Sequence, residues 1–234
     1  LIIGWISTYP NDRNRPAYDA VLQAETGWMS TNGEEGKPPL KLPIAVIDVF
    51  ASHQLRAGIL TAILHKQSSQ RGSLVEVFLV EAGLAAQVNQ SSYALNQMVN
   101  PSPMGSAHPN ICPYGDLVVC KGGDYLLFAV GTDAQYLRLA KTLHDSRLLA
   151  DSFRTNAQRV IHRTTLIDIL QEICRKHSAL SLHNKLTAAK IPCAQVQGIL
   201  DAFNQQPQMV HETVIDNTSF FVGKTTSFHL ESNP

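Results

Sequence analysis

Short apolar runs alternate with longer helix-like segments over the first hundred residues, and this alternation most constrains the fold. The runs at residues 1–6 and 74–80 have the length and the composition of buried strands. Residues 18–25, 50–65 and 81–96 have the apolar spacing or the Ala-rich composition of helices. Strands that alternate with helices in this way usually pair in parallel within one sheet. The pattern therefore predicts an α/β layer.

A second kind of pattern begins near Asn100, where two prolines and Gly105 predict a linker. Beyond it, residues 117–120 and 125–130 flank a Gly-Gly-Asp turn and predict a β-hairpin. Further helices are predicted at residues 134–143, 165–177, 181–190 and 196–203, and further strands at residues 210–215 and 219–222. We therefore expect a large α/β domain over residues 1–99, a smaller α+β domain over 100–206, and a return to the large domain over 207–234.

The balance of charges argues against two classes of partner. Among the 234 residues, 19 Lys and Arg are matched by 19 Asp and Glu, so the formal net charge is +0. Domains that bind nucleic acid or anionic membranes usually carry a basic excess, because the neutralisation of phosphates supplies much of the affinity. The longest apolar stretches, such as residues 58–64, are far shorter than the roughly 18 residues that cross a bilayer. We expect no nucleic-acid partner and no membrane span.

The residue types that usually hold metals or cofactors show no recognisable spacing. None of the nine histidines belongs to an HxH or HExxH motif, and none of the four cysteines belongs to a CxxC motif. The glycine motifs of dinucleotide-binding folds and of P-loops are also absent. We therefore expect no metal and no permanently bound cofactor. Four scattered cysteines also favour a reducing compartment over a disulfide framework.

Asp48 is the carboxylate best placed for chemistry. It follows a strand-like apolar run at residues 44–47 and precedes the helix expected at residues 50–65. Open α/β sheets present reactive groups at this kind of position, beyond the ends of their strands. Asp is also among the preferred helix N-cap residues, and from the pattern alone the N-cap is the commoner role. The two roles are compatible.

Six motifs, in the same order along the chain, resemble those of a known family. They are RPAYDAVLQAE (residues 15–25), GWMS (27–30), GILTAIL (58–64), GSAHPNICPY (105–114), TNAQRV (155–160) and IPCAQV (191–196). In these motifs the chain is similar to class III CoA-transferases of the CaiB/BaiF type, a family that includes formyl-CoA transferases, succinate-dependent dicarboxylate CoA-transferases and α-methylacyl-CoA racemases. The resemblance implies an α/β fold with part of a Rossmann-like large domain and its parallel sheet, plus a smaller α+β domain. The family's N-terminal half of the large domain has no counterpart here, so we expect a fragment or a decayed copy.

The resemblance gives Asp48 a nucleophilic role. It implies that Asp48 forms an aspartyl-CoA thioester while CoA passes from an acyl-CoA to a carboxylic acid. A helix N-terminus would favour the ionised carboxylate that starts this reaction. The coenzyme A thioester is then a substrate and not a resident cofactor. The interlocked dimers of the family imply a homodimer.

The remaining site residues follow from the same resemblance. Racemases of the family carry a histidine where Tyr18 stands, and a phenol with a pKa of about 10 is a poor base near neutral pH, so Tyr18 favours transfer. Tyr18 could equally be a core aromatic whose hydroxyl finds a partner. Arg15 and Tyr18 are the residues that we expect to contact CoA, although a solvated surface arginine is the commoner case. His108, Asn110 and Tyr114 lie in a polar motif near the expected interdomain cleft, where we expect contact with substrate.

Two alternatives to an active transferase stay open. One is a truncated, catalytically silent homologue, which the missing N-terminal half favours. The other is an isomerase similar to α-methylacyl-CoA racemase, which Tyr18 disfavours. The expected location is cytoplasmic or mitochondrial.

Overall fold

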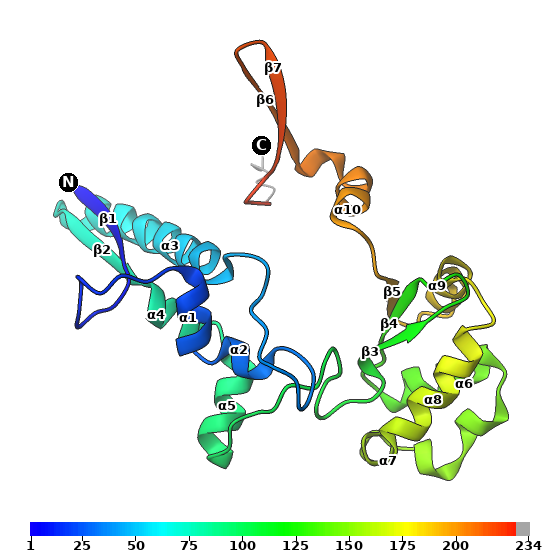
Figure 1. The fold of residues 1–234 in the computed structure, drawn as a ribbon. Helices are drawn as coiled ribbons and strands as arrows, with labels where there is room; N and C mark the ends of the chain where they lie inside the picture. Colours follow the sequence, from blue (N-terminus) through cyan, green and yellow to red (C-terminus); the bar gives the residue numbers. More distant parts are fainter. Residues whose placement is uncertain (228–234) are drawn as a thin grey trace. The chain divides into compact units, whose positions relative to one another are not determined.

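The computed structural model describes residues 1–227. The chain divides into two compact units, Leu1–Pro109 and Asn110–Pro234 (Figure 1). We describe each unit by itself. The expected return of residues 207–234 to the large domain stays a prediction, and residues 228–234 lie outside the described residues.

The first unit contains a parallel pair of strands. β1 (Ile2–Ser7) pairs with β2 (Ser73–Phe78), so that Ile2 lies opposite Ser73 and Ser7 lies opposite Phe78. Both strands and their parallel pairing were expected from the sequence, and both are confirmed. The helices of this unit are α1 (Asp19–Glu25), α2 (Trp28–Thr31), α3 (Val46–Ser69), α4 (Leu79–Ala85) and α5 (Val88–Gln97).

The long helix α3 packs against both strands, alongside which it runs in Figure 1. Two glycines make this close approach possible. A Cβ atom at Gly58 would lie 2.4 Å from Cγ1 of Val75, and a Cβ atom at Gly4 would lie 2.9 Å from Cδ1 of Ile59. Real Cβ atoms need more room than this. A Cβ at Gly58 would push α3 away from β2 at Val75, whereas a Cβ at Gly4 would force the flexible end of Ile59 to move.

Two predictions for the first unit were wrong. Residues 44–47 do not form a strand, because α3 already begins at Val46. The single helix expected at residues 81–96 is two helices, α4 and α5, that meet at Ala86 and Gln87. The side-chain amide of Gln87 donates to the carbonyl of Thr26 at 3.1 Å, so a tertiary hydrogen bond fixes the break between the helices.

The second unit is built on an antiparallel sheet of three strands in the order β3 (Tyr114–Val119), β4 (Tyr125–Ala129) and β5 (Cys193–Gln195). The hairpin of β3 and β4 confirms the expectation from the Gly-Gly-Asp turn. The strand β5 was not predicted. The helices around this sheet are α6 (Asp133–Leu143), α7 (Asn156–Ile161), α8 (Arg163–Cys174) and α9 (Ala179–Ala188), with short 3-10 helices η1 (Ser146–Leu149) and η2 (Asp151–Phe153).

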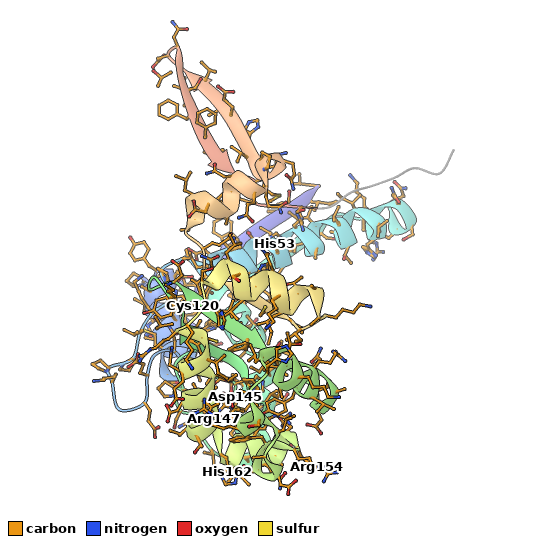
Figure 2. All side chains as sticks on the ribbon, turned by 90° about the vertical axis from the view of Figure 1, so that its right-hand side faces the viewer. His53, Cys120, Asp145, Arg147, Arg154 and His162 are labelled. Atoms are coloured by element: carbon orange, nitrogen blue, oxygen red, sulfur yellow. The ribbon has the colours of Figure 1, made fainter. Side chains whose placement is uncertain are left out.

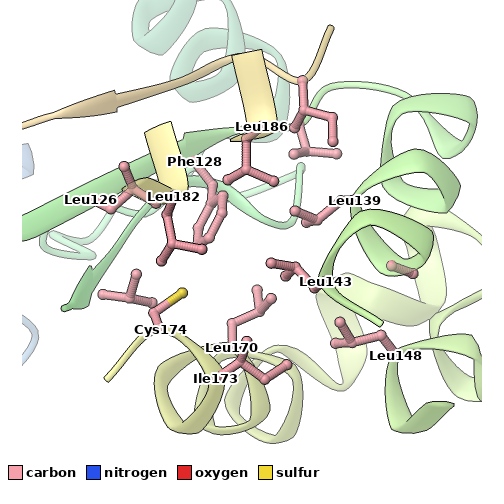
Figure 3. Close-up of a cluster of buried hydrophobic side chains, with 14 of the residues drawn as sticks. Leu126, Phe128, Leu139, Leu143, Leu148, Leu170, Ile173, Cys174, Leu182 and Leu186 are labelled. Atoms are coloured by element: carbon pink, nitrogen blue, oxygen red, sulfur yellow. The ribbon is translucent and has the colours of Figure 1, made fainter. Parts of the chain in front are cut away.

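A continuous hydrophobic core fills the space between this sheet and its helices (Figure 3). Phe128 from β4 lies among leucines from α6, α8 and α9, including Leu139, Leu170 and Leu186. All four side chains are fully buried. The helix α6 that lines this core begins with a complete capping box between Thr132 and Gln135, so local sequence and tertiary packing agree here.

The chain continues after the sheet with α10 (Ile199–Gln205), the 3-10 helix η3 (Pro207–Met209) and a hairpin of β6 (Val210–Ile215) and β7 (Thr218–Gly223). The sequence predicted this helix and both strands, and all three are confirmed. Within the hairpin, Phe220 and Phe221 are largely exposed.

Candidate functional site

The candidate site in the first unit is built where the N-termini of α1 and α3 meet. Asp19, the first residue of α1, is buried at 8% exposure. Its Oδ2 atom accepts hydrogen bonds from the backbone N–H of Ile47 at 2.7 Å and from that of Asp48 at 3.3 Å. A carboxylate of α1 thus binds the first turn of α3, which carries the candidate nucleophile.

Asp48 is the third residue of α3 and not its N-cap. The expected N-cap role is therefore wrong, because the helix begins earlier than the strand-like run suggested. The N-cap is Ala45, which has no polar side chain and makes no cap hydrogen bond. The Asp48 side chain is exposed and starts from the first turn of a 24-residue helix.

The surroundings of Asp48 disfavour its charged form. Partial desolvation raises the pKa of Asp48 above its usual value, and the negative charge of Asp19 raises it further. We expected the helix N-terminus to favour the anion, and these two effects act in the opposite direction. A carboxylate with a raised pKa is more basic once ionised, which suits a nucleophile.

The two residues expected to contact CoA lie just before α1. Tyr18 is the N-cap of α1 and is 83% exposed, so the alternative of a core aromatic is wrong. Arg15 forms an ion pair with Glu25, and its guanidinium lies 4.3 Å from the centre of the Tyr9 ring. Tyr9 in turn donates a hydrogen bond from its hydroxyl to Glu25 at 2.7 Å. Contact of Arg15 and Tyr18 with CoA stays a prediction.

The other candidate residues lie, along the chain, on either side of the point where the first unit ends. His108 is half-buried near the end of the first unit, while Asn110 and Tyr114 belong to the second. Tyr114 begins β3, and its backbone N–H donates to Asp116 at 2.8 Å. Asn110 is exposed, and its carbonyl accepts from the amide of Asn156 at 2.8 Å. Their contact with substrate stays a prediction.

Side chains of α7 and α8 hold the backbone between Asn110 and Tyr114. Arg163 donates to the carbonyl of Ile111 at 2.8 Å and pairs with the buried Asp116 at 2.7 Å. Arg159, which is fully buried, donates to the carbonyl of Cys112 at 2.8 Å. This network gives the loop a fixed conformation within the second unit.

Sequence reasoning did not find the contacts that build these two networks, although Asn110 itself was predicted as a substrate residue. Asp19 and Gln23 are spaced four residues apart on α1, so two polar residues on one face of a short helix were an available signal. No such signal exists for Asn156 and Asn110, because they are 46 residues apart and share no pattern.

Metal-ligating side chains are dispersed in the part of the chain that the structure describes. His53 lies on α3, whereas His162 lies between α7 and α8 (Figure 2). Among residues 1–227, no group of three His, Cys, Asp or Glu side chains could hold a metal ion. In the same range, no helix is both long and apolar enough to traverse a bilayer.

A family model for CoA-transferase family III matches residues 1–227. The chain is 30% identical to the succinate–glutarate CoA-transferase of Agrobacterium fabrum over 187 residues, which are 80% of this chain and 46% of that protein. It is 24% identical to the human succinyl-CoA:glutarate CoA-transferase over 215 residues, which are 92% of this chain and 48% of that protein. The chain thus spans about half the length of these curated relatives.

Solved structures show the same fold. The crystal structure of a CaiB/BaiF family protein from Brucella suis superposes with a TM-score of 0.81 at 24% sequence identity. The superposition covers 97% of this chain and 61% of that one. The expected fold class is therefore confirmed over nearly the whole chain.

Proposed function

The chain belongs to CoA-transferase family III, and from this premise we propose that it transfers CoA from an acyl-CoA to a carboxylic acid through an aspartyl-CoA thioester on Asp48. The observation that carries the proposal is the placement of an exposed carboxylate on the first turn of α3, held there by Asp19. The relatives named as succinate–glutarate and succinyl-CoA:glutarate CoA-transferases support a dicarboxylic acid as donor or acceptor.

The reaction balances without any proton or redox partner. The Asp48 carboxylate attacks the thioester carbonyl, which forms a mixed anhydride and releases CoA thiolate. The thiolate attacks the aspartyl carbonyl, which forms the aspartyl-CoA thioester and releases the donor acid as its carboxylate. The acceptor carboxylate then attacks the aspartyl thioester, and the thiolate leaves and returns to the acceptor carbonyl. Acyl-CoA of the acceptor is released and the Asp48 carboxylate is restored.

The other candidate residues have supporting roles in this proposal. The exposed phenol of Tyr18 and the guanidinium of Arg15 contact CoA, and His108, Asn110 and Tyr114 contact the acid. A phenol is too weak a base near neutral pH to remove an α-proton readily, so Tyr18 supports transfer over racemisation. We also propose a homodimer and a cytoplasmic or mitochondrial location. All four cysteines are free, as expected in a reducing compartment.

The decisive experiment is intact-protein mass spectrometry after incubation with succinyl-CoA or acetyl-CoA. We expect a covalent CoA adduct whose peptide maps to Asp48, and we expect hydroxylamine to convert the adduct to a hydroxamate with release of CoA. The variant Asp48→Asn keeps the size of the side chain but lacks the nucleophilic carboxylate, so it should form no adduct.

The matched control is Asp201→Asn, because Asp201 is also an exposed aspartate in the first turn of a helix. It should form the adduct at the wild-type rate. Each protein is tested alone and with a polypeptide that supplies the part of the Agrobacterium fabrum relative that has no counterpart here. An adduct that needs the added polypeptide would make this chain one part of a longer active unit. No adduct under either condition would contradict transfer from these donors and favour the silent homologue.

A further inference from the structure

The start of α3 is fixed from outside the helix. A helix leaves its first backbone N–H groups without partners, and a side chain at the N-cap usually binds one of them. The N-cap of α3 is Ala45, whose methyl group cannot accept a hydrogen bond, and no side-chain cap is formed. The carboxylate of Asp19 supplies the missing acceptor from α1.

Asp19 binds two consecutive amides with one oxygen. Its Oδ2 lies 2.7 Å from the nitrogen of Ile47 and 3.3 Å from the nitrogen of Asp48. Because Asp19 is only 8% exposed, these hydrogen bonds are shielded from bulk water. Hydrogen bonds to a charged acceptor are about twice as strong as neutral ones. A shift of the Asp19 side chain would therefore also shift the backbone of Asp48.

Gln23 holds Asp19 from the next turn of α1. Its side-chain nitrogen donates to Oδ1 of Asp19 and, at 3.1 Å, to the carbonyl of Ile44. Its side-chain oxygen accepts from the backbone N–H of Leu42 at 2.8 Å. Gln23 is 1% exposed. Two buried side chains of α1 thus bind both the loop before α3 and the first turn of α3.

We propose that Asp19 is a positioning residue for the Asp48 nucleophile and that Gln23 holds Asp19 in the orientation that this needs. The inference rests on the proposed function, because the nucleophilic role of Asp48 is part of that proposal. Asp19 acts through the backbone and does not itself touch substrate. Misplacement of a reacting group by about 1 Å can cost roughly a hundredfold in rate.

Asp19 also acts on Asp48 through its charge, which raises the pKa of the Asp48 carboxyl. The elements that pack most extensively against α3 are α1, α4, β1 and β2, and these four carry no basic side chain. Their other acidic side chains are Glu25 on α1, Glu76 on β2 and Glu81 on α4. Of these acidic groups, Asp19 is the one whose charge raises the pKa of Asp48. The positional and the electrostatic effects of Asp19 can therefore be separated by substitution.

Two variants make this separation. Asp19→Asn retains an oxygen acceptor but loses the charge, whereas Asp19→Ala loses both. Hydrogen exchange at the amides of residues 47 and 48, followed by NMR, reports on position. The pH titration of the Asp48 carboxyl carbon reports on charge, and the rate of the CoA adduct at Asp48 reports on function. Asp201→Asn serves again as the control that should change none of the three.

We expect Asp19→Ala to exchange both amides faster than wild type and to slow adduct formation about 10- to 100-fold. Asp19→Asn should keep more of the amide protection and of the adduct rate than Asp19→Ala, because its side-chain oxygen can still accept from the two amides. It should keep less than wild type, because the acceptor is neutral and an NH2 group replaces the oxygen that accepts from Gln23. The pKa of Asp48 should fall in both variants, because both remove the neighbouring negative charge. A purely structural role would not produce this split between the two variants.

Unchanged exchange at both amides in Asp19→Ala would overturn the inference, whatever the adduct rate. If the wild-type protein forms no adduct, the proposed function fails, while exchange and titration still decide whether Asp19 fixes the position and the charge of Asp48. If Asp19→Ala does not fold, as judged by circular dichroism, Asp19→Asn decides. Faster exchange than wild type at the amides of residues 47 and 48 then supports the inference, because a neutral acceptor binds them more weakly, and exchange at the wild-type rate overturns it.

Discussion

The two units differ sharply in how they are held together. Among residues 1–227, the hydrophobic cluster of the second unit contains 20 buried residues, whereas that of the first contains three, Tyr9, Leu22 and Ile47. The first unit also leaves large apolar side chains exposed, among them Trp5 at 56% and Leu74 at 65%. Parallel sheets are normally covered on both faces, and this one has two strands and one long covering helix.

This difference changes how the candidate nucleophile is positioned. Asp48 lies in the unit with the smaller core, so hydrophobic packing alone contributes less to fixing its helix. Asp19 and Gln23, which make the polar contacts, are buried on α1 next to Leu22, a fully buried member of that small core. A unit of this kind depends on a few specific interactions. The loss of one of them should unfold the first unit, whereas a comparable loss should leave the second unit folded.

The largest expected effect is seen in the unchanged protein, whose two units should unfold at different urea concentrations. The chain carries natural probes for this, because both tryptophans lie in the first unit and all four cysteines lie in the second. Trp28 packs against the core of the first unit, so its fluorescence reports the loss of that core. Alkylation of Cys112, Cys120 and Cys174, which are buried, reports the opening of the second unit.

We expect the fluorescence transition at a clearly lower urea concentration than the onset of alkylation, because the smaller core buries less apolar surface. Coincident midpoints for the two probes would show that the units unfold as one and would remove the contrast on which the next predictions depend.

A matched pair of leucine substitutions should sharpen the comparison. Leu22 on α1 and Leu170 on α8 are both fully buried, so replacement by Ala should cost each unit about 2–5 kcal/mol. In the first unit this is enough to shift the fluorescence of Trp28 to that of an unfolded chain without any urea. In the second unit, Leu170→Ala should only lower the urea concentration at which the cysteines become reactive.

Exposed leucines provide the controls for this pair. Leu64 on α3 is 66% exposed and Leu180 on α9 is 60% exposed, so their replacement by Ala should leave both transitions nearly unchanged. The contrast is contradicted if Leu22→Ala retains the native fluorescence of Trp28 while Leu170→Ala unfolds the second unit.

The sequence predicted the elements whose signals are local and failed where a distant residue decides the structure. The paired strands β1 and β2, the Gly-Gly-Asp hairpin and the helix α6 all carry their own periodicity or turn chemistry. The start of α3 does not. Residues 44–47 are all apolar and include three β-branched side chains typical of a strand. Even so, a carboxylate 28 residues earlier binds the amide of Ile47 in the first turn of a helix.

The candidate site shows the same division. The resemblance to the family led to Asp48. The hydrogen bonds by which Asp19 and Gln23 bind the start of α3 became visible only in the structure. The strand β5 is another example, because its three residues join the edge of β4 through contacts that are far apart in the sequence. Short segments with long-range partners leave too little periodicity to be detected.

The smallest expected effect is one of pH, and it should change the stability of the second unit and not that of the first. Burial raises the pKa of Cys112 and of Cys174 to about 12, from an ordinary value of 9.0. A thiol with a raised pKa in the folded state holds its proton more tightly there than in the unfolded chain. Its contribution to stability is therefore complete below pH 9 and is lost as the pH rises from 9 towards 12.

At pH 9.5, half a unit above the ordinary thiol pKa, the two buried thiols together should lower the unfolding free energy of the second unit by about 1–2 kcal/mol. The first unit has no cysteine, so its Trp28 transition should not move between pH 7.5 and 9.5. The measurement is urea unfolding followed by far-UV circular dichroism, with a reductant present. The midpoint to compare is that of the second unit, whose transition Trp28 fluorescence does not report. In the double variant Cys112→Ala and Cys174→Ala, this pH dependence should become clearly smaller. It should not vanish, because burial also raises the pKa of Cys120 and of Cys193, which remain. A second-unit midpoint that stays constant with pH in the unchanged protein would show that these thiols ionise as readily in the folded unit as in the unfolded one.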